Sequence, residues 1–215
     1  MDTKKGGKLV LDSDRVPIEI ENWDKDVVQV LVEKRADVFT KEEASRPLAD
    51  FELDLTVNDG GREIVLNGES SNSRRSNSLD VRFIIKVPMR YNIAVETGGG
   101  GINIGDLQGN VDAETSGGGI EVEFIAGGGD RHYTLETAGG DINISLPSDM
   151  KATVYAELRI QKRGWSSKDY DIYSDSKLDI DKKEGDLISA RGKINGGGNM
   201  VRLRTTNGDI NIEKR

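Results

Sequence analysis

Hydrophobic and polar residues alternate along most of the chain. Residues 16–20, 28–32, 51–57 and 79–85 carry an apolar side chain at nearly every second position. A period of two is typical of strands that bury one face and expose the other. Glycine, asparagine, aspartate and serine separate these runs, and such residues favour turns. The pattern therefore predicts an all-β protein.

Four segments in the second half of the chain align with one another without gaps. Each contains a strand, a threonine, a turn rich in glycine and a short strand that begins with isoleucine. The segments are residues 92–104, 110–122, 132–144 and 200–212, with threonines Thr97, Thr115, Thr137 and Thr205 and isoleucines Ile102, Ile120, Ile142 and Ile210. In every copy the threonine lies five residues before the isoleucine. Such repeats indicate a solenoid or another stacked β architecture.

The alternation also assigns an inner and an outer face to each repeat. In the first repeat Ile93, Val95 and Thr97 share one face before the turn, and Ile102 and Ile104 share one face after it. We expect these positions, and their equivalents in the other repeats, to point inward. Stacking of the repeats about 4.8 Å apart would then build one narrow core.

Glycine accounts for 26 of the 215 residues, and a large share of it lies at this recurring turn. A coil that changes direction within a few residues needs positive φ or a backbone packed against the next coil, and glycine allows both. The threonine hydroxyl can satisfy a backbone group that the turn leaves unpaired. The residues expected to shape the turns are Thr97, Gly99, Thr115, Gly118, Thr137, Gly140, Thr205 and Gly208.

These patterns predict a single domain with a β-solenoid fold, that is, a single-stranded β-helix-like stack of short strands with glycine-rich turns. Residues 1–90 are expected to add longer, less regular strands, and residues 91–147 to form the regular repeats. Residues 148–199 are expected to form further coils with a polar insertion, and residues 200–215 the closing repeat.

The composition removes several classes of function. The chain has no cysteine and a single histidine, His132, which excludes thiol chemistry, Cys-ligated metals and sites that need two imidazoles. Its net charge of −8 repels phosphate backbones, so no nucleic-acid partner is expected. No apolar run approaches the ~18 residues of a membrane span, and the first residues lack the apolar segment of a signal peptide. Either the protein is cytoplasmic or a signal or anchor was removed, and the sequence leaves both open.

Several segments together resemble a known family. Trp23 precedes an alternating strand, and the strand at 79–88 ends in Val-Pro and leads into Thr-x-Gly-Gly-x-Ile repeats. The chain closes with Ile-Asn-Gly-Gly-Gly at 194–198 and Leu-Arg-Thr-Thr-Asn-Gly-Asp-Ile at 203–210. These features resemble the bacterial putative-adhesin family of β-strand-repeat proteins, a domain of unknown function. Gly-Ile-Asn at 101–103 is also similar to the related Gly-Ile-Asn head domain of putative autotransporter adhesins.

The resemblance covers most of the chain and has consequences for fold and location. It implies a β-solenoid-like fold in an exported or membrane-anchored bacterial protein, and therefore an extracytoplasmic location in the periplasm or at the cell surface. The family carries no established catalytic residues, so the resemblance transfers none to this sequence.

One pattern suggests a calcium site, and it has a simpler alternative. Glu96, Glu114 and Glu136 hold the same outward position in three repeats, so repeats stacked in register would form an acidic column. Carboxylate oxygens at this spacing suit Ca²⁺. The alternative is a solvated face on which the glutamates splay apart and Arg202 and Arg204 neutralise them.

Two glycine-rich motifs are better explained as tight turns. Gly-Gly-Gly-Asp at 127–130 and Gly-Gly-Asp at 139–141 resemble part of a calcium-roll nonapeptide, but the repeats are not nine residues long. No Gly-x-x-x-x-Gly-Lys-Ser/Thr motif occurs, and the turns join strands rather than a strand to a helix. No metal or cofactor is therefore expected.

The chain offers two further sets of candidate residues. Trp165, Tyr170 and Tyr173 lie in the polar insertion, where they either stack on a sugar or anchor a partner, or else cap the edge of the solenoid. Paired carboxylates would serve a carbohydrate-active enzyme. The residues considered for that role are Asp112, Glu114, Glu121, Glu123 and Arg131. Outward carboxylates are nevertheless expected in a chain with 32% charged residues.

The function expected is a non-catalytic surface or envelope module that presents a rigid acidic β face to a protein or glycan. The alternative is a structural scaffold or oligomerisation domain of an envelope-stress system, with a β-helix carbohydrate-active enzyme as a third class. The candidate binding residues are Glu96, Glu114, Glu136, Trp165, Tyr170 and Tyr173. A homo-oligomer formed by end or edge stacking is a further expectation.

Overall fold

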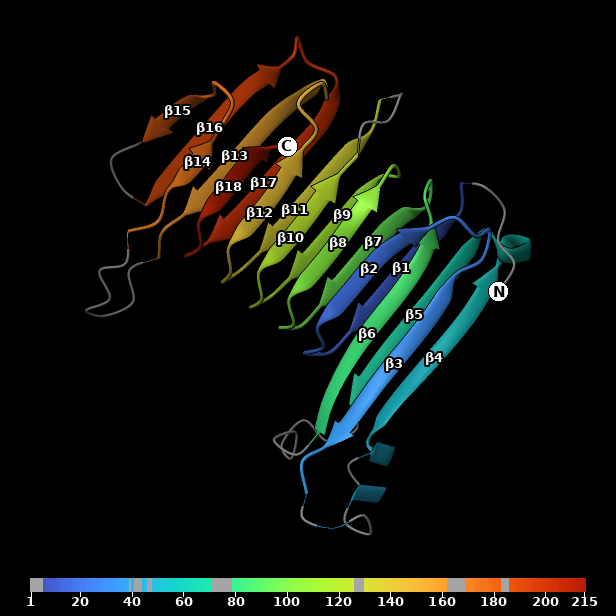
Figure 1. The fold of residues 1–215 in the computed structure, drawn as a ribbon. Coiled ribbons are helices and arrows are strands. Elements are labelled where there is room, and N and C mark those ends of the chain that lie inside the picture. Colours follow the sequence, from blue (N-terminus) through green and yellow to red (C-terminus); the bar gives the residue numbers. More distant parts are fainter. Residues whose placement is uncertain are drawn as a thin grey trace.

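The protein is built from two β-sheets (Figure 1). The computed structural model describes residues 6–38, 40, 44–45, 48–70, 79–125, 130–161, 169–182 and 186–215. The described residues include one short 3₁₀ turn at Asp59–Gly61 and no helix long and apolar enough to cross a membrane. Within these residues neither sheet closes on itself. The prediction of an all-β protein is confirmed.

The strands of each sheet follow a spatial order that differs from their order along the chain. The ten-stranded sheet contains β15 (Asp179–Lys182), β16 (Leu187–Ile194), β13 (Ala152–Arg159), β17 (Asn199–Thr206), β11 (His132–Thr137), β9 (Val111–Thr115), β7 (Asn92–Thr97), β1 (Lys8–Ser13), β5 (Glu63–Ser70) and β4 (Phe51–Asn58). The eight-stranded sheet contains β14 (Ile172–Ser174), β18 (Ile210–Lys214), β12 (Ile142–Leu146), β10 (Ile120–Phe124), β8 (Ile102–Leu107), β2 (Ile18–Trp23), β6 (Leu79–Pro88) and β3 (Gln29–Ala36).

The repeating unit of the stack is a pair of strands, one from each sheet, which we call a rung. The connection between its two strands is the arch. Neighbouring rungs pair in parallel in both sheets, in the order β5/β6, β1/β2, β7/β8, β9/β10, β11/β12, β17/β18 and β13/β14. Antiparallel strands flank the stack, with β4 and β3 at one end and β16 and β15 at the other.

The four repeats found in the sequence form four adjacent rungs in exact register. Thr97 pairs with Thr115, Thr115 with Thr137, and Thr137 with Thr205. The predicted inward positions are buried: in the first repeat Ile93, Val95 and Thr97 before the arch, and the isoleucines of β8 after it, are all exposed by less than 5%. The parity argument is therefore confirmed, and the core is a narrow apolar layer between the two sheets.

A fifth copy of the repeat lies near the N-terminus and was not recognised in the sequence. Residues 8–20 pair with residues 92–104, so that Ser13 lies beside Thr97 and Ile18 beside Ile102. Ser13 also lies five residues before its isoleucine. The spacing of the repeat was therefore present, but serine replaces the threonine, and Asp-Arg-Val-Pro at 14–17 replaces the four glycines of the first repeat.

The first and last rungs along the chain lie inside the stack rather than at its ends. Rung β1/β2 lies between β5/β6 and β7/β8, and rung β17/β18 lies between β11/β12 and β13/β14. Residues up to 90 thus extend the stack beyond the first rung, and residues 148–199 supply one rung and two flanking strands. Because neighbours pair with the terminal rungs on both sides, these rungs cannot fray without opening the stack.

Candidate functional site

The arch threonines bind the backbone of the neighbouring rung. Thr115 Oγ1 donates to the Gly100 carbonyl at 2.8 Å, Thr137 to Gly118 at 2.8 Å, and Thr205 to Gly140 at 2.7 Å. Thr115 Oγ1 also accepts the N–H groups of Gly117 and Gly118 in its own arch, at 3.5 and 3.3 Å. The predicted role of the hydroxyl is confirmed, and the partner proves to be the next rung as well as the turn itself.

The arch glycines are required for close stacking rather than for positive φ. None of the arch glycines of the four repeats has positive φ. A Cβ at Gly118 would lie 2.3 Å from the Gly100 oxygen, and the same contact recurs at Gly140 and Gly208. In the first repeat the tight position is Gly100, because a Cβ at Gly99, the position expected from the sequence, would meet only the Arg15 side chain at 3.3 Å.

Aspartates at the arch ends serve as backbone caps. Asp141 Oδ1 accepts the Asp209 N–H at 2.8 Å, and Asp209 Oδ1 accepts the Asp171 N–H at 2.9 Å. Burial opposes ionisation of Asp171, but hydrogen bonds from Lys182 and the Ile172 N–H hold the pKa of its carboxyl below the ordinary value. Gly-Gly-Asp at 139–141 is therefore a structural motif. The other calcium-roll candidate, 127–130, falls largely outside the described residues.

The glutamates of the predicted acidic column lie in register on the outer face of the ten-stranded sheet, which we call the column face. Glu96 pairs with Glu114 and Glu114 with Glu136. The next residue in the row is Arg204, whose guanidinium lies 3.3 Å from the Glu136 carboxylate and 4.0 Å from that of Glu157. Among the described residues no group of three or more His, Cys, Asp or Glu side chains is placed to hold a metal ion.

Reversing the charge of Arg204 should weaken the stack. Arg204→Glu places a carboxylate directly opposite Glu136 and Glu157, so we expect a loss of about 1 kcal/mol in the free energy of unfolding at low salt. The loss should shrink as salt screens the exposed charges. Arg202→Glu is the matched control, because Thr134 and Tyr155 flank Arg202. Denaturant unfolding at two salt concentrations measures both, and equal losses would exclude the column as the cause.

The outer face of the eight-stranded sheet, which we call the groove face, carries a second row of polar side chains. Pairing places them side by side across six strands. The row consists of Glu19, Asn103, Glu121, Asn143, Asn211 and Tyr173. Asn211 Nδ2 donates to Asn143 Oδ1 at 2.7 Å. Regular pairing thus turns one outward position of the repeat into a continuous row of hydrogen-bonding groups.

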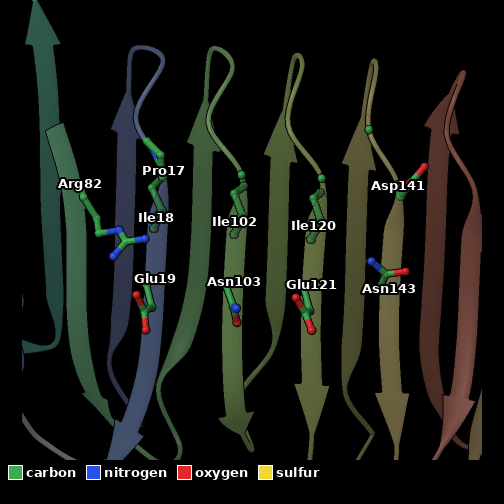
Figure 2. Close-up of a pocket in the computed structure, with 13 residues that line it drawn as sticks. Pro17, Ile18, Glu19, Arg82, Ile102, Asn103, Ile120, Glu121, Asp141 and Asn143 are labelled. Atoms are coloured by element: carbon green, nitrogen blue, oxygen red, sulfur yellow. The ribbon is translucent and has the colours of Figure 1, made fainter. Parts of the chain in front are cut away.

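A groove of about 510 Å³ runs along this row, next to the arches (Figure 2). Four members of the row line the groove, namely Glu19, Asn103, Glu121 and Asn143. Gly101 and Gly119, which precede the isoleucines of β8 and β10, leave its floor without side chains on these two rungs, whereas Pro17 and Asp141 hold the equivalent positions on the flanking rungs. Arg82 lies at one end and Asp141 at the other, and the side chains of Glu19 and Glu121 lie parallel rather than converging (Figure 2). The groove therefore offers amide and carboxylate groups to an extended ligand.

The structure separates the binding residues expected from the sequence. The three column glutamates lie on the column face, whereas Tyr173, 54% exposed, ends the row on the groove face. Tyr170 is partly buried against the core, and Trp165 lies outside the described residues. The catalytic candidates are divided as well, with Asp112 and Glu114 on β9 of one sheet and Glu121 and Glu123 on β10 of the other.

Of the polar groove residues, sequence reasoning named only Glu121 as a candidate catalytic or binding residue and missed Glu19, Arg82, Asn103, Asp141 and Asn143. Two of these come from rungs that were not recognised in the sequence. Glu19 belongs to the unrecognised fifth repeat, at the position that Asn103 holds in the first. Arg82 precedes Phe83, which pairs with Ile18, but a long connection separates β6 from β5 and hides this rung in the sequence. Aligning residues 8–20 with the other repeats would have found Glu19, whereas only the strand pairing places Arg82.

Comparison with known proteins supports the fold and leaves the function open. A crystal structure described as a putative cell adhesion protein from Clostridium sporogenes matches with a TM-score of 0.67, over 100% of this chain and 96% of that chain. At 12% sequence identity this likeness shows the fold alone. Comparison with curated proteins gave no match. Residues 90–213, more than half of the chain, match the model of a domain of unknown function, and the protein therefore belongs to the Toastrack DUF4097 family.

Proposed function

We propose that the protein is a non-catalytic binding module of the cell surface that holds an extended glycan in the groove of the eight-stranded sheet. The observation that carries the proposal is the row of amide and carboxylate side chains along a groove whose floor carries no side chain at Gly101 and Gly119. Neutral sugar hydroxyls both donate and accept hydrogen bonds, and Asn103 and Asn143 offer both partners, while Glu121 accepts. The name of the Clostridium protein supports a surface role.

Tyr173 extends this site beyond the groove. It follows Asn143 and Asn211 in the same row, so a chain that lies along the row reaches an exposed aromatic ring. Aromatic rings with one polar end are common in binding surfaces, because they bury large apolar area and keep a hydrogen-bonding group. The row thus combines hydrogen-bonding groups with a stacking surface.

The stacked rungs supply the rigidity that the proposal requires. We regard the parallel two-sheet stack as a β-solenoid, in which each rung contacts only its neighbours and every outward position repeats at the strand spacing of about 4.8 Å. A ligand with its own repeat can then meet equivalent groups on several rungs. An enzyme is a weaker proposal, because the acids lie parallel along the groove and Asn103 separates Glu19 from Glu121.

A glycan array followed by titration calorimetry with the best ligand tests the proposal. Replacing Asn103 and Glu121 together by alanine should lower affinity at least about tenfold, since each lost hydrogen bond contributes on the order of 1 kcal/mol. The matched control replaces Glu96 and Glu114 by alanine, on the same two rungs but on the column face. The Glu96/Glu114 variant should bind the glycan with unchanged affinity.

Two results would contradict this proposal. The first is the absence of any glycan ligand on the array, and the second is an equal loss of affinity in both double variants. Binding to a protein in a pull-down from native envelope material, abolished by the groove variant alone, would instead make the partner a protein.

A scaffold role is the second candidate, and one observation favours it. Inward-facing apolar side chains of β4 remain exposed at one end of the stack, among them Leu55 and Val57. An exposed core at a long edge is suited to self-association.

A further inference from the structure

The two ends of the stack differ in the length of their edge strands. β4 and β3 are the last strands of their sheets at one end, and each has eight residues. At the other end the last strands are β15, with four residues, and β14, with three. Short edge strands hinder pairing with another sheet, whereas long ones present a row of unpaired backbone groups. The β3/β4 end is therefore the one to which another strand pair can be added.

The core is also incompletely covered at the β3/β4 end. Leu55 and Val57 point inward opposite Leu66 and Ile64, yet they are 40% and 44% exposed whereas their partners are fully buried. On β3, Val32 faces the same way opposite Phe83 and is only partly buried. Lys34 also faces inward on β3 and donates to the carbonyls of Phe51 and Leu48 at 2.6 and 3.3 Å, and it still leaves Leu55 and Val57 exposed. A further pair of strands would remove this apolar area from water.

We propose that a second copy of this chain covers the β3/β4 end, related by a two-fold axis perpendicular to both sheets. In such a dimer β4 pairs antiparallel with the partner's β4, and β3 pairs antiparallel with the partner's β3. Each strand then meets its own copy, as an isologous interface requires. The two stacks become one continuous stack with a shared core.

Charge decides the register of β4 in this dimer. The two registers with the greatest overlap place the axis at Asp54 or at Leu55. An axis at Asp54 sets two carboxylates directly opposite each other, which is destabilising. An axis at Leu55 sets Asp54 opposite the partner's Thr56 and Glu52 opposite the partner's Asn58. Leu55 then meets its own copy in the core.

The two-fold axis at Leu55 of β4 must also pass through a residue of β3 that can pair with its own copy, and it does. Thr115 Oγ1 binds the Gly100 carbonyl, so the arch threonine and this glycine lie at one height. Val95 lies two residues before Thr97, the strand partner of Thr115, and Ile102 lies two residues after Gly100. Val95 and Ile102 therefore also lie at one height, measured along the strand direction. Strand pairing carries the height of Val95 to Leu55 and that of Ile102 to Val32. An axis through Leu55 therefore passes Val32.

At Val32 the charges of β3 agree with those of β4. An axis at Val32 sets Gln29 opposite the partner's Arg35, Leu31 opposite the partner's Glu33 and Val30 opposite the partner's Lys34. The Lys34 ammonium donates to the Phe51 carbonyl of its own chain at 2.6 Å, so it is already paired. Moving the axis one residue toward the arches brings Asp54 of β4 onto its own copy and Glu33 of β3 onto its own copy. Both strands thus disfavour the register centred on Asp54 and Glu33, and both accept the register centred on Leu55 and Val32. This agreement identifies a second copy of this chain as the occupant.

Single cysteines test the register directly, because the chain contains none. Leu55→Cys lies on the axis, where opposed Cα atoms are about 4.5–5.5 Å apart and a disulfide can form. Mild oxidation should convert most of this variant to a covalent dimer. Leu53→Cys faces the partner's Val57 and should remain largely uncross-linked. Ile180→Cys is the matched control, because it points inward on β15 at the other end and is 41% exposed, against 40% for Leu55.

Sedimentation velocity of the wild type gives an independent reading. We expect a dimer at about 100 µM, which a dissociation constant in the micromolar range would populate. Leu55→Lys should shift it to monomer and Ile180→Lys should not, with the wild-type circular dichroism spectrum as the check on folding. A monomeric wild type, or equal cross-linking of Leu55→Cys and Ile180→Cys, would overturn the proposal. The Asn103/Glu121 groove variant should still dimerise, so failure of glycan binding and failure of dimerisation are separate results.

Discussion

Gly118→Ala is expected to lower the free energy of unfolding by about 3 kcal/mol or more. The added Cβ would lie 2.3 Å from the carbonyl oxygen of Gly100 and 2.5 Å from its carbonyl carbon. Both are backbone atoms of the neighbouring rung, so no side-chain rotation can relieve the overlap. The two rungs must separate locally, and their pairing and the core beneath them are both weakened.

Gly117→Ala is the control for this prediction. It changes the adjacent residue of the same arch, but the nearest atom to its Cβ is the Gly99 Cα at 3.8 Å, an ordinary contact. Its effect should stay within about 0.5 kcal/mol, because alanine also restricts the unfolded chain. Urea unfolding of both variants measures the difference. Similar losses would mean that the arch conformation, rather than the close approach of rungs, requires glycine.

Thr115→Val is expected to lower the free energy of unfolding by about 2–3 kcal/mol. The substitution keeps the shape of a side chain that is 1% exposed and removes its hydroxyl. The Gly100 carbonyl then loses its donor, and the N–H groups of Gly117 and Gly118 lose an acceptor. The Gly100 carbonyl is buried, so water does not replace its missing donor without opening the stack, and this group carries most of the loss. Gly117 is exposed and Gly118 half-buried, so their N–H groups contribute less.

Thr115→Ser separates the hydroxyl from the methyl group. It keeps the hydrogen bonds and removes one buried methyl, so a loss of about 1 kcal/mol is expected. Ser13 holds the equivalent position in the N-terminal rung and also donates to a neighbouring rung, although its acceptor at 3.1 Å is the carbonyl of its own strand partner Gly68 rather than an arch glycine. Thermal and urea unfolding should therefore rank valine as the more damaging change. A larger loss for serine would show that packing of the methyl outweighs the hydrogen bonds.

The repeats allowed much of the fold to be predicted before the structure was known. Positions such as Val95, Thr97 and Ile102 recur with fixed spacing in the repeats. Because side chains of a strand alternate between its two faces, this spacing assigns each of them to the buried face. The fifth copy at residues 8–20 escaped recognition because its arch lacks glycine and carries serine in place of threonine. The rung formed by β5 and β6 escaped because its long connection breaks the spacing on which the repeat was recognised.

The candidate site was predictable only in part. The acidic column followed from the alignment, and the structure places Glu96, Glu114 and Glu136 in register as the alignment implied. The groove did not follow from it, because a groove depends on which side chains are absent from the floor and which residues close its ends. Arg82 reaches the groove from a strand that is remote in sequence from β8 and β10.

Local chemistry along the chain was sufficient to determine the strands, their inner and outer faces and the arches, because each depends on residues within one repeat. The order of the rungs depends on which strands pair across long distances, and no single repeat contains that information. Only the tertiary structure places β1/β2 and β17/β18 inside the stack, assigns Tyr173 and Glu96 to opposite faces, and leaves Leu55 exposed at one end. The physical reason is that every rung presents nearly the same backbone edge to its neighbours. The sequence of one repeat cannot specify which neighbour it receives, whereas the connections and the flanking antiparallel strands can.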